Sequence, residues 1–239
     1  MITITGVSGG YGGLDILSDF GMSVEGGTIN CIVGPNGAGK STVLKTVSGI
    51  LRPRVGSIVV DGVEIVGKSP AQILKAGIVQ VPQRNGLFAG LTVAQNVRMG
   101  AYVNRRGSRA IAERYEELAG LFPIIAERAD ERAGSLSGGQ RRLVEFARAM
   151  MLKPRVVLLD EPTLGLDPIT RGIVHASTRA MNEAGATILM VEQNVRFGLN
   201  LADHVTVMTA GSVVLTGTSA EIGQHPNLMG LFFAEAPSL

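Results

Sequence analysis

The chain has 239 residues, of which 45% are hydrophobic and 18% charged, enough for one sizeable domain or two small ones. Its formal net charge of +2 is too small to indicate nucleic-acid binding, and its single cysteine, Cys31, excludes an internal disulfide framework. The N-terminus lacks the basic and apolar regions of a secretory signal, and no apolar stretch approaches the roughly 20 residues that cross a bilayer. We therefore expect any membrane role to depend on a partner.

The first 83 residues are predicted to form short strands separated by tight turns, together with two helices. The expected strands are ITIT (2–5), DILSDFGMSV (15–24), TINCIV (28–33), GSIVV (56–60) and IVQVP (78–82). GGYGG (9–13) is expected to be a turn between the first two. Ser69 followed by Pro70 has the pattern of a helix N-cap and a first-turn proline, which predicts a short helix through Lys75.

Helical periodicity replaces this pattern in residues 84–154. Apolar residues recur at helical spacing in two series, Ile111, Tyr115, Leu118, Phe122 and then Leu143, Phe146, Ala147, Met150, Met151. After Pro154 the alternation resumes with VVLL, a helix from about Pro168, ILMV, another short helix, VTVM and SVVLTG. This order predicts a single α/β domain over residues 1–239, interrupted by a helical insertion at about 84–154.

GPNGAGKS, Gly34 to Ser41, is a phosphate-binding loop between a predicted strand and a predicted helix. Its glycines let the backbone wrap a polyphosphate so that successive N–H groups point at the anion. In this motif Lys40 reaches the β- and γ-phosphates, and the Ser41 hydroxyl can ligate Mg²⁺. The motif in this context predicts binding of a nucleoside triphosphate with Mg²⁺.

VVLLDEP, Val156 to Pro162, is a second buried strand that ends in two carboxylates. Asp160 at the strand end suits the acidic group that holds the Mg²⁺ of a phosphate-binding loop. Glu161 is placed to accept a proton from the water that attacks the γ-phosphate. The sequence therefore predicts hydrolysis of the bound nucleoside triphosphate, with Lys40 and Glu161 as catalytic residues.

LSGGQRR, Leu136 to Arg142, contains a second candidate anion site. Ser137 is predicted to cap a helix whose first turn holds Gly138 and Gly139. Small residues there leave backbone N–H groups bare, and the helix dipole adds positive potential. A chain with one phosphate-binding loop has little use for a second site unless it serves another chain's nucleotide, so we expect a head-to-tail pair of ATPase subunits.

Taken in order, GPNGAGKST, Gln83, LSGGQ, VVLLDEP, LGLD (164–167) and ILMVEQN resemble the nucleotide-binding domain of ABC transporters over essentially the whole chain. The resemblance implies an α/β P-loop NTPase fold, a RecA-like core with an antiparallel β subdomain and an inserted helical subdomain. It also implies that Tyr11 stacks on adenine, that Gln83 senses Mg²⁺ and the membrane partner, and that Asp167 links two ATP sites. The nucleotide contacts that it implies are Gly34, Pro35, Asn36, Gly37, Ala38, Gly39, Lys40, Ser41, Thr42, Ser137, Gly138, Gly139 and Gln140.

Gln193 narrows the resemblance to a subfamily. It follows the apolar run ILMV and Glu192, at the position where most of the family has a histidine beside the γ-phosphate. VEQN with glutamine is characteristic of the F-type ATPase of branched-chain amino acid importers, although that subunit often has alanine at the Asp167 position and glutamate at the Gln83 position. ATPases for urea and amide import, and for lipopolysaccharide export, share much of the pattern and stay open as alternatives.

The resemblance also implies partners and a location. The implied partners are membrane-spanning permeases, a second ATPase subunit in a homodimer or heterodimer, and an extracytoplasmic binding protein. The implied location is peripheral, on the cytoplasmic face of the membrane. No nucleic-acid partner is expected. A non-transport ABC ATPase and an ATP-binding regulatory module without turnover are the other classes considered.

Overall fold

A computed structural model describes residues 2–83, 86–103 and 107–233. Its larger sheet has six strands in the order β10-β9-β3-β8-β7-β6, and all but β10 run parallel to their neighbours. These strands are β3 (Ile29–Val33), β6 (Ile78–Val81), β7 (Val156–Asp160), β8 (Thr187–Glu192), β9 (His204–Thr209) and β10 (Ser212–Thr218). The predicted α/β fold class and these predicted strands are confirmed.

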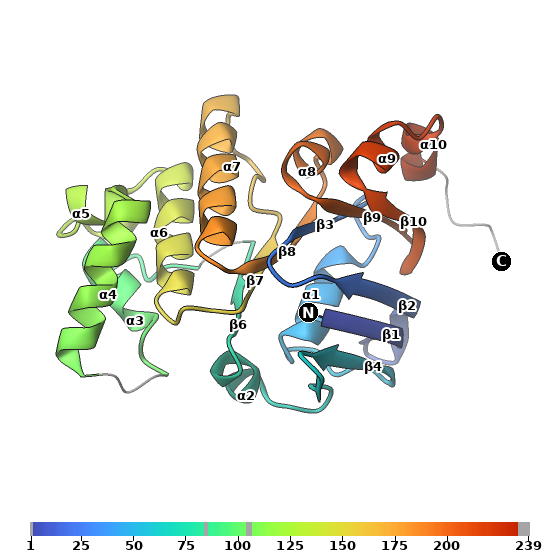
Figure 1. Cartoon of the computed structure of the whole chain (residues 1–239), viewed down its shortest axis with the longest axis horizontal. Coiled ribbons are helices and arrows are strands. Elements are labelled where there is room, and N and C mark those ends of the chain that lie inside the picture. The colour runs from blue at the N-terminus through green and yellow to red at the C-terminus, as the bar shows by residue number, and fades with distance from the viewer. Residues whose placement is uncertain (1, 84–85, 104–106, 234–239) are drawn as a thin grey trace.

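The central strands are buried on both faces, which explains their continuous apolar runs. Every residue of β3, β7 and β8 is buried. Alternate side chains enter two cores, so that Ile32 packs on one face and Cys31 on the other. The first face is covered by α1 (Lys40–Val47) and the second by α6 (Gly138–Met150), α7 (Pro168–Glu183) and α8 (Val195–Leu201) (Figure 1).

A smaller antiparallel sheet packs on the α1 side, in the order β2-β1-β4-β5. Its strands are β1 (Ile2–Tyr11), β2 (Leu14–Val24), β4 (Val55–Val60) and β5 (Val63–Glu64). The prediction of GGYGG as a turn is wrong in extent, because β1 continues to Tyr11 and only Gly12 and Gly13 form the turn. Gly10 belongs to the strand because it pairs with Asp15 of β2, and it is a glycine because a Cβ there would lie 2.0 Å from the carbonyl oxygen of Leu14.

The helices between β6 and β7 gather at one end of the molecule (Figure 1). They are α3 (Val93–Met99), α4 (Ser108–Leu121), α5 (Ile124–Glu127), a 3₁₀ turn (Ala133–Ser135) and α6. The predicted helical periodicity is confirmed, since Tyr115 and Leu118 of α4 and Phe146 and Met150 of α6 are buried in one core. The limits of the helical subdomain, about 84–154, remain a prediction from the sequence. Within them, residues 84–85 and 104–106 lie outside the described part of the chain.

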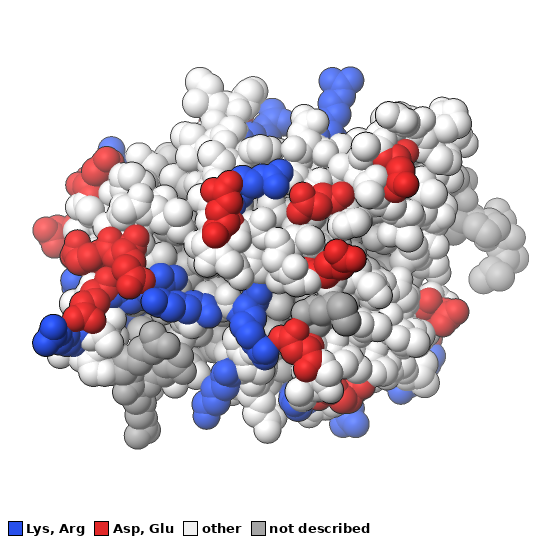
Figure 2. Space-filling view, in the orientation of Figure 1, with Lys and Arg blue, Asp and Glu red and all other residues white. Residues whose placement is uncertain are grey.

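Short helices complete the fold. The predicted helix after Ser69 is α2 (Pro70–Lys75), with Ser69 as its N-cap. Two helices not expected from the sequence, α9 (Ser219–Gly223) and α10 (Leu228–Phe233), follow β10. In the described ranges, no helix is both long and apolar enough to cross a membrane. On the face in Figure 2 both signs of charge are present, and acidic side chains gather over α4.

Candidate nucleotide site

The phosphate-binding loop joins β3 to α1 at the carboxyl edge of the large sheet. Gly34 must be glycine, because a Cβ there would lie 2.2 Å from the carbonyl oxygen of Met208 in β9. Gly37 and Gly39 have φ of +81° and +97°, which L side chains rarely adopt. These constraints curl residues 34–39 into a concave backbone ahead of α1, the shape that presents N–H groups to an anion.

Lys40 and Ser41 open α1 and point in different directions. The Lys40 Nζ donates hydrogen bonds to the carbonyl oxygens of Gly34 and Pro35, both at 2.9 Å, and lies 3.7 Å from Glu161 Oε1. The Ser41 hydroxyl donates to Asp160 Oδ1 at 2.8 Å. The P-loop thus meets both carboxylates that follow β7.

Glu161 occupies an unusual backbone conformation. Its φ is +44°, in the left-handed region that costs a non-glycine residue about 1–3 kcal/mol. Its N–H donates to the carbonyl oxygen of Val191 in β8 at 3.0 Å, which anchors the turn to the neighbouring strand. Successive side chains of a strand point to opposite faces. The left-handed residue breaks this alternation, so that Asp160 and Glu161 both face the P-loop.

Gln83 belongs to the segment that follows β6, and its side chain reaches the Glu161 carboxylate. Its Nε2 donates to Glu161 Oε2 at 2.6 Å. Gln83 and Glu161 line a cavity of about 300 Å³ with Lys40, Ser41 and Asn36. The other residues that line it are Ile16, Gly37, Gly39 and Thr42. Ile16, on β2, was not anticipated, because it belongs to a strand of ordinary amphipathic pattern.

Burial shifts the pKa values of two groups, Lys40 in this cavity and Asp160 beside it. It lowers the pKa of the Lys40 ammonium, an effect that the nearby Glu161 carboxylate opposes. It raises the pKa of Asp160, an effect that the hydrogen bond from Ser41 opposes. Clustered perturbed groups in a cavity are typical of functional sites.

Glu192 is a buried acid for which the sequence suggested no role. It ends β8, is 2% exposed, and its Oε1 accepts hydrogen bonds from the N–H and hydroxyl of Thr163 at 3.1 and 2.8 Å. Burial raises its pKa, and the bonds from Thr163 oppose the shift. Glu192 thus fastens the turn after Glu161 to β8; an acid directly after a fully buried strand is the signal that could have identified it.

Gln193 lies on the rim of an adjoining cavity. Its side chain is exposed, and it lines a space of about 390 Å³ together with Glu161, Leu166 and Arg171. It does not line the cavity that contains Lys40 and Ser41. The cavity beside Gln193 and the P-loop cavity are therefore adjacent, because Glu161 lines both of them.

The LSGGQ residues form the start of α6, as predicted. Ser137 is the N-cap: its hydroxyl accepts from Gln140 N–H at 3.3 Å, while Gln140 Oε1 accepts from Ser137 N–H at 2.9 Å. Gly139 is small for a packing reason, since a Cβ there would lie 2.1 Å from the Thr170 side chain. Gly138 is exposed. Within the described residues, none from Ser137 to Gln140 lines the P-loop cavity of its own chain.

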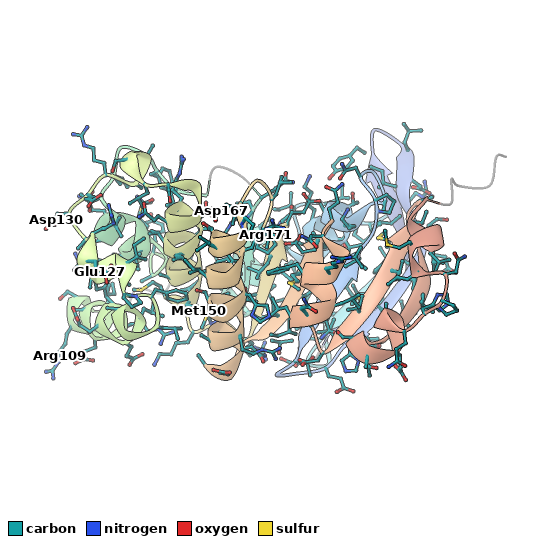
Figure 3. The ribbon with its side chains drawn as sticks, turned by 90° about the horizontal axis from the view of Figure 1, so that it is seen from above. Arg109, Glu127, Asp130, Met150, Asp167 and Arg171 are labelled. Atoms are coloured by element: carbon teal, nitrogen blue, oxygen red, sulfur yellow. The ribbon has the colours of Figure 1, made fainter. Side chains whose placement is uncertain are left out.

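Tyr11 and Asp167 lie at the margins of this region. Tyr11 ends β1, is 44% exposed, and has the Lys45 Nζ 5.3 Å from its ring centroid. Asp167 is the N-cap of α7, where it accepts from the N–H groups of Ile169 and Thr170, both at 3.0 Å (Figure 3). Hydrogen bonds from Thr170 hold the pKa of Asp167 below its usual value.

Comparison with known proteins identifies the family. The ABC transporter family matches residues 17–164. The chain belongs to this family. It is an ATP-binding subunit of a transport ATPase, and such subunits bind nucleotide and work with membrane permease subunits.

Relatives and solved structures resemble the chain over nearly its full length. The high-affinity branched-chain amino acid transport ATP-binding protein BraG of Pseudomonas aeruginosa is 36% identical, over 95% of this chain and 97% of that protein. A probable branched-chain amino acid transport ATP-binding protein LivF of Archaeoglobus fulgidus is 34% identical, over 94% and 95%. An ATP-binding cassette of an ABC transporter, solved in its ADP conformation, has a TM-score of 0.89 at 25% identity and covers 98% of this chain and 99% of that one.

Glu192 generates a prediction about pH. Glu192→Gln keeps an oxygen that can accept from Thr163 but removes the titrating group. Because burial raises the Glu192 pKa above its ordinary 4.5, the folded protein holds a proton that the unfolded chain has already lost. This destabilises the parent increasingly as pH rises above that value. We expect the unfolding free energy of the variant, relative to the parent, to increase from about pH 4 to about pH 7, measured by urea denaturation.

The exposed Glu113→Gln is the control for removing a surface carboxylate. A Glu192→Gln difference that stays constant across the pH series would contradict the burial argument.

Proposed function

We propose that this subunit hydrolyses ATP at its P-loop with Glu161 as the general base, and so powers an importer of branched-chain or related amino acids. The observation that supports the chemistry is the convergence of Lys40, Ser41, Gln83 and Glu161 on one cavity, with Asp160 hydrogen-bonded to Ser41 beside it. Backbone N–H groups of the P-loop bind the phosphates, and Lys40 contributes charge to the β- and γ-oxygens. Glu161 takes the proton of the attacking water.

The residues at Ser41 and Asp160 fit Mg²⁺. Their Oγ and Oδ1 atoms are hard oxygen donors within hydrogen-bond distance of each other, and a Mg²⁺ site of this class uses one or two protein oxygens besides phosphate. When bound, the ion neutralises charge on the β- and γ-phosphates. We propose that Ser41 and Asp160 hold it, with Gln83 beside it.

We further propose that a second ATPase subunit completes each site. The exposed Gly138, in the first turn of α6, has backbone N–H groups beside it without intrahelical acceptors, which suits a γ-phosphate bound to a partner subunit. The exposed Leu164 lines both the cavity beside that helix start and the Gln193 cavity, and we propose that the partner covers this surface and meets Asp167, three residues further along the chain.

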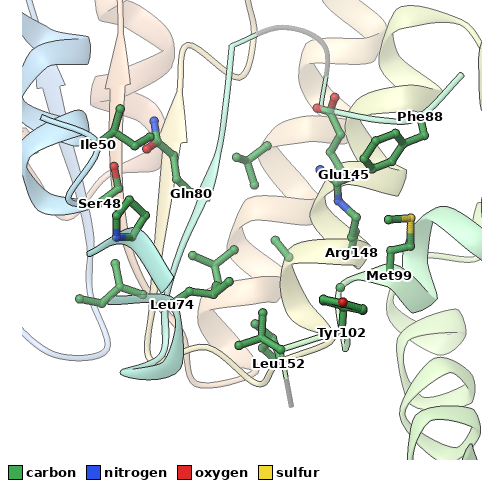
Figure 4. A pocket seen from close by; sticks show the side chains of 17 residues that line it. Ser48, Ile50, Leu74, Gln80, Phe88, Met99, Tyr102, Glu145, Arg148 and Leu152 are labelled. Carbon is green, nitrogen blue, oxygen red and sulfur yellow. The ribbon is translucent and has the colours of Figure 1, made fainter. Parts of the chain in front are cut away.

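The permeases need a docking surface, and we propose the groove between the sheet and the helical subdomain, here called the docking groove. It has a volume of about 380 Å³ and includes Ile50, Phe88, Met99 and Tyr102, of which each is at least 41% exposed (Figure 4). Exposed apolar side chains around a groove suit an amphipathic helix of a membrane subunit. This docking would hold the subunit on the cytoplasmic face of the membrane, with an extracytoplasmic binding protein on the other side.

The choice of substrate is tested on the whole transporter. The chain, its permeases and a second ATPase would be reconstituted in proteoliposomes with the binding protein, and uptake of labelled leucine measured. We expect unlabelled isoleucine and valine to compete, and urea and methionine not to. Uptake of urea in place of leucine would refute the proposed substrate class. A relative from Myxococcus xanthus that is 37% identical is named as a methionine-import ATP-binding protein, and uptake of methionine without any branched-chain amino acid would favour that substrate instead.

Glu161→Gln tests the base. The change preserves size and the contact with Gln83 but removes the proton acceptor, so turnover should fall at least about a hundredfold. ATP binding should persist, because Lys40 and the P-loop backbone are intact, whereas Lys40→Ala should weaken it. Both are measured by steady-state hydrolysis and by titration with labelled ATP. Hydrolysis by Glu161→Gln at the parent rate would show that another group is the base.

Gln193→Ala tests whether the amide reaches the γ-phosphate. Losing a donor to a charged oxygen typically costs about 1.5–3 kcal/mol, so kcat should fall roughly 10–150-fold with less effect on nucleotide affinity. Gln193→His should keep activity and gain a titration near neutral pH, because imidazole ionises there. Turnover of Gln193→Ala close to that of the parent, measured with the partner ATPase present, would instead indicate a solvated loop amide.

A further inference from the structure

Helix α6 carries a buried ion pair that the nucleotide site does not contain. Arg142 Nη1 and Glu145 Oε2 are 2.7 Å apart, one helical turn from each other, and their side chains are 9% and 8% exposed. Burying two charges costs desolvation energy, which their mutual attraction repays only when their remaining polar atoms are also bonded. The hydrogen-bond partners of those remaining atoms therefore show what the ion pair holds in place.

The remaining atoms of the pair hold the segment that contains Gln83. Arg142 donates from Nη1 to the carbonyl oxygen of Pro82 at 2.9 Å and from Nη2 to that of Gln83 at 2.8 Å. On the far side of the same segment, Gly86 N–H donates to Glu145 Oε1 at 3.1 Å. The pair therefore fixes the backbone both before and after residues 84–85.

Gln83 continues this chain of contacts to the reaction centre, since its side chain donates to Glu161 Oε2 at 2.6 Å. Glu145 also borders the docking groove. With its neighbour Arg148 it lines the docking groove beside Phe88 and Met99 (Figure 4). The pair thus lies between the docking groove and the contact of Gln83 with Glu161.

We propose that Arg142 and Glu145 are positioning residues that hold Gln83 against Glu161 and make this contact respond to what occupies the docking groove. A helix pressed into the groove would meet Glu145 and Arg148 directly. A displacement of α6 or of Gly86 would then move the backbone of Gln83 through Arg142. The inference rests on the proposed roles of Glu161 and the groove, and concerns residues outside the nucleotide cavity.

A double-mutant cycle on the assembled transporter tests whether Glu145 acts on ATP hydrolysis through Gln83. Glu145→Gln keeps the length of the side chain and an acceptor for Gly86, but removes the charge that holds Arg142. We expect kcat for ATP to fall about tenfold while KM stays within about twofold, because Lys40 and Ser41 are unchanged. In a Gln83→Ala background the same substitution should lower kcat by less than about twofold, since the contact through which it acts is already absent.

Stimulation by the permeases tests the link to the groove. The ratio of kcat in the assembled transporter to kcat of the isolated ATPase subunits should fall toward one in Glu145→Gln. Glu131→Gln is the matched control, because it removes a carboxylate from the exposed i,i+3 pair with Arg128 in the same group of helices. It should retain the parent values of kcat, KM and stimulation.

A further variant separates positioning from stability. Arg142→Met with Glu145→Met removes the side-chain hydrogen bonds to the backbone of Pro82, Gln83 and Gly86 and leaves neither charge of the pair buried without its partner. Because these three backbone groups lose their partners, the melting temperature is measured beside kcat, and kcat at a temperature at which the variant is folded should fall as it does in Gln83→Ala. Retained kcat in this variant, or fully additive losses in the cycle, would overturn the inference. Failure to transport branched-chain amino acids would refute the proposed substrate only, because these measurements read ATP hydrolysis.

Discussion

The site depends on the left-handed backbone of Glu161. At φ +44° the chain leaves β7 in a direction that turns two consecutive carboxylates toward the P-loop, which a continued strand would not do. Asp160 then meets Ser41, and Glu161 meets both Lys40 and Gln83. The conformation is costly for a glutamate, and the surrounding structure holds it through the bond from Glu161 N–H to Val191.

The neighbouring strand supports this turn from a second direction. Glu192 ends β8 as Asp160 ends β7, and it bonds both polar groups of Thr163, two residues beyond Glu161. The turn is therefore held at its start by Val191 and at its end by Glu192. Parallel strands whose carboxyl ends meet at one edge make this possible, which is why the fold concentrates its polar residues there.

Two further surfaces, the start of α6 and the docking groove, expose groups that have no partner within the described part of the subunit's own nucleotide site. The exposed start of α6 and the apolar docking groove both lie outside the P-loop cavity, and our proposals assign a different partner to each. Helix α6 connects them, because it begins at Gly138 and carries Glu145 and Arg148 along the groove. Since Arg142 on the same helix binds the Gln83 segment, one rigid element touches three regions that must act together in a coupled transport ATPase.

The sequence by itself determined the six strands of the large sheet, the P-loop, the caps at Ser69 and Ser137, and the family, because these depend on local chemistry. Apolar runs, helical periodicity and glycine patterns are legible within a few residues of chain. It could not specify contacts such as those of Glu192 with Thr163, of Arg142 with Pro82, or of Ile16 with the cavity. These join segments 29, 60 and about 20 residues apart, and only the tertiary structure brings them together. The turn at GGYGG was misjudged for a different, local reason: β1 pairs with β2 as far as Tyr11 and Leu14, so that only Gly12 and Gly13 are left to form the turn of this hairpin.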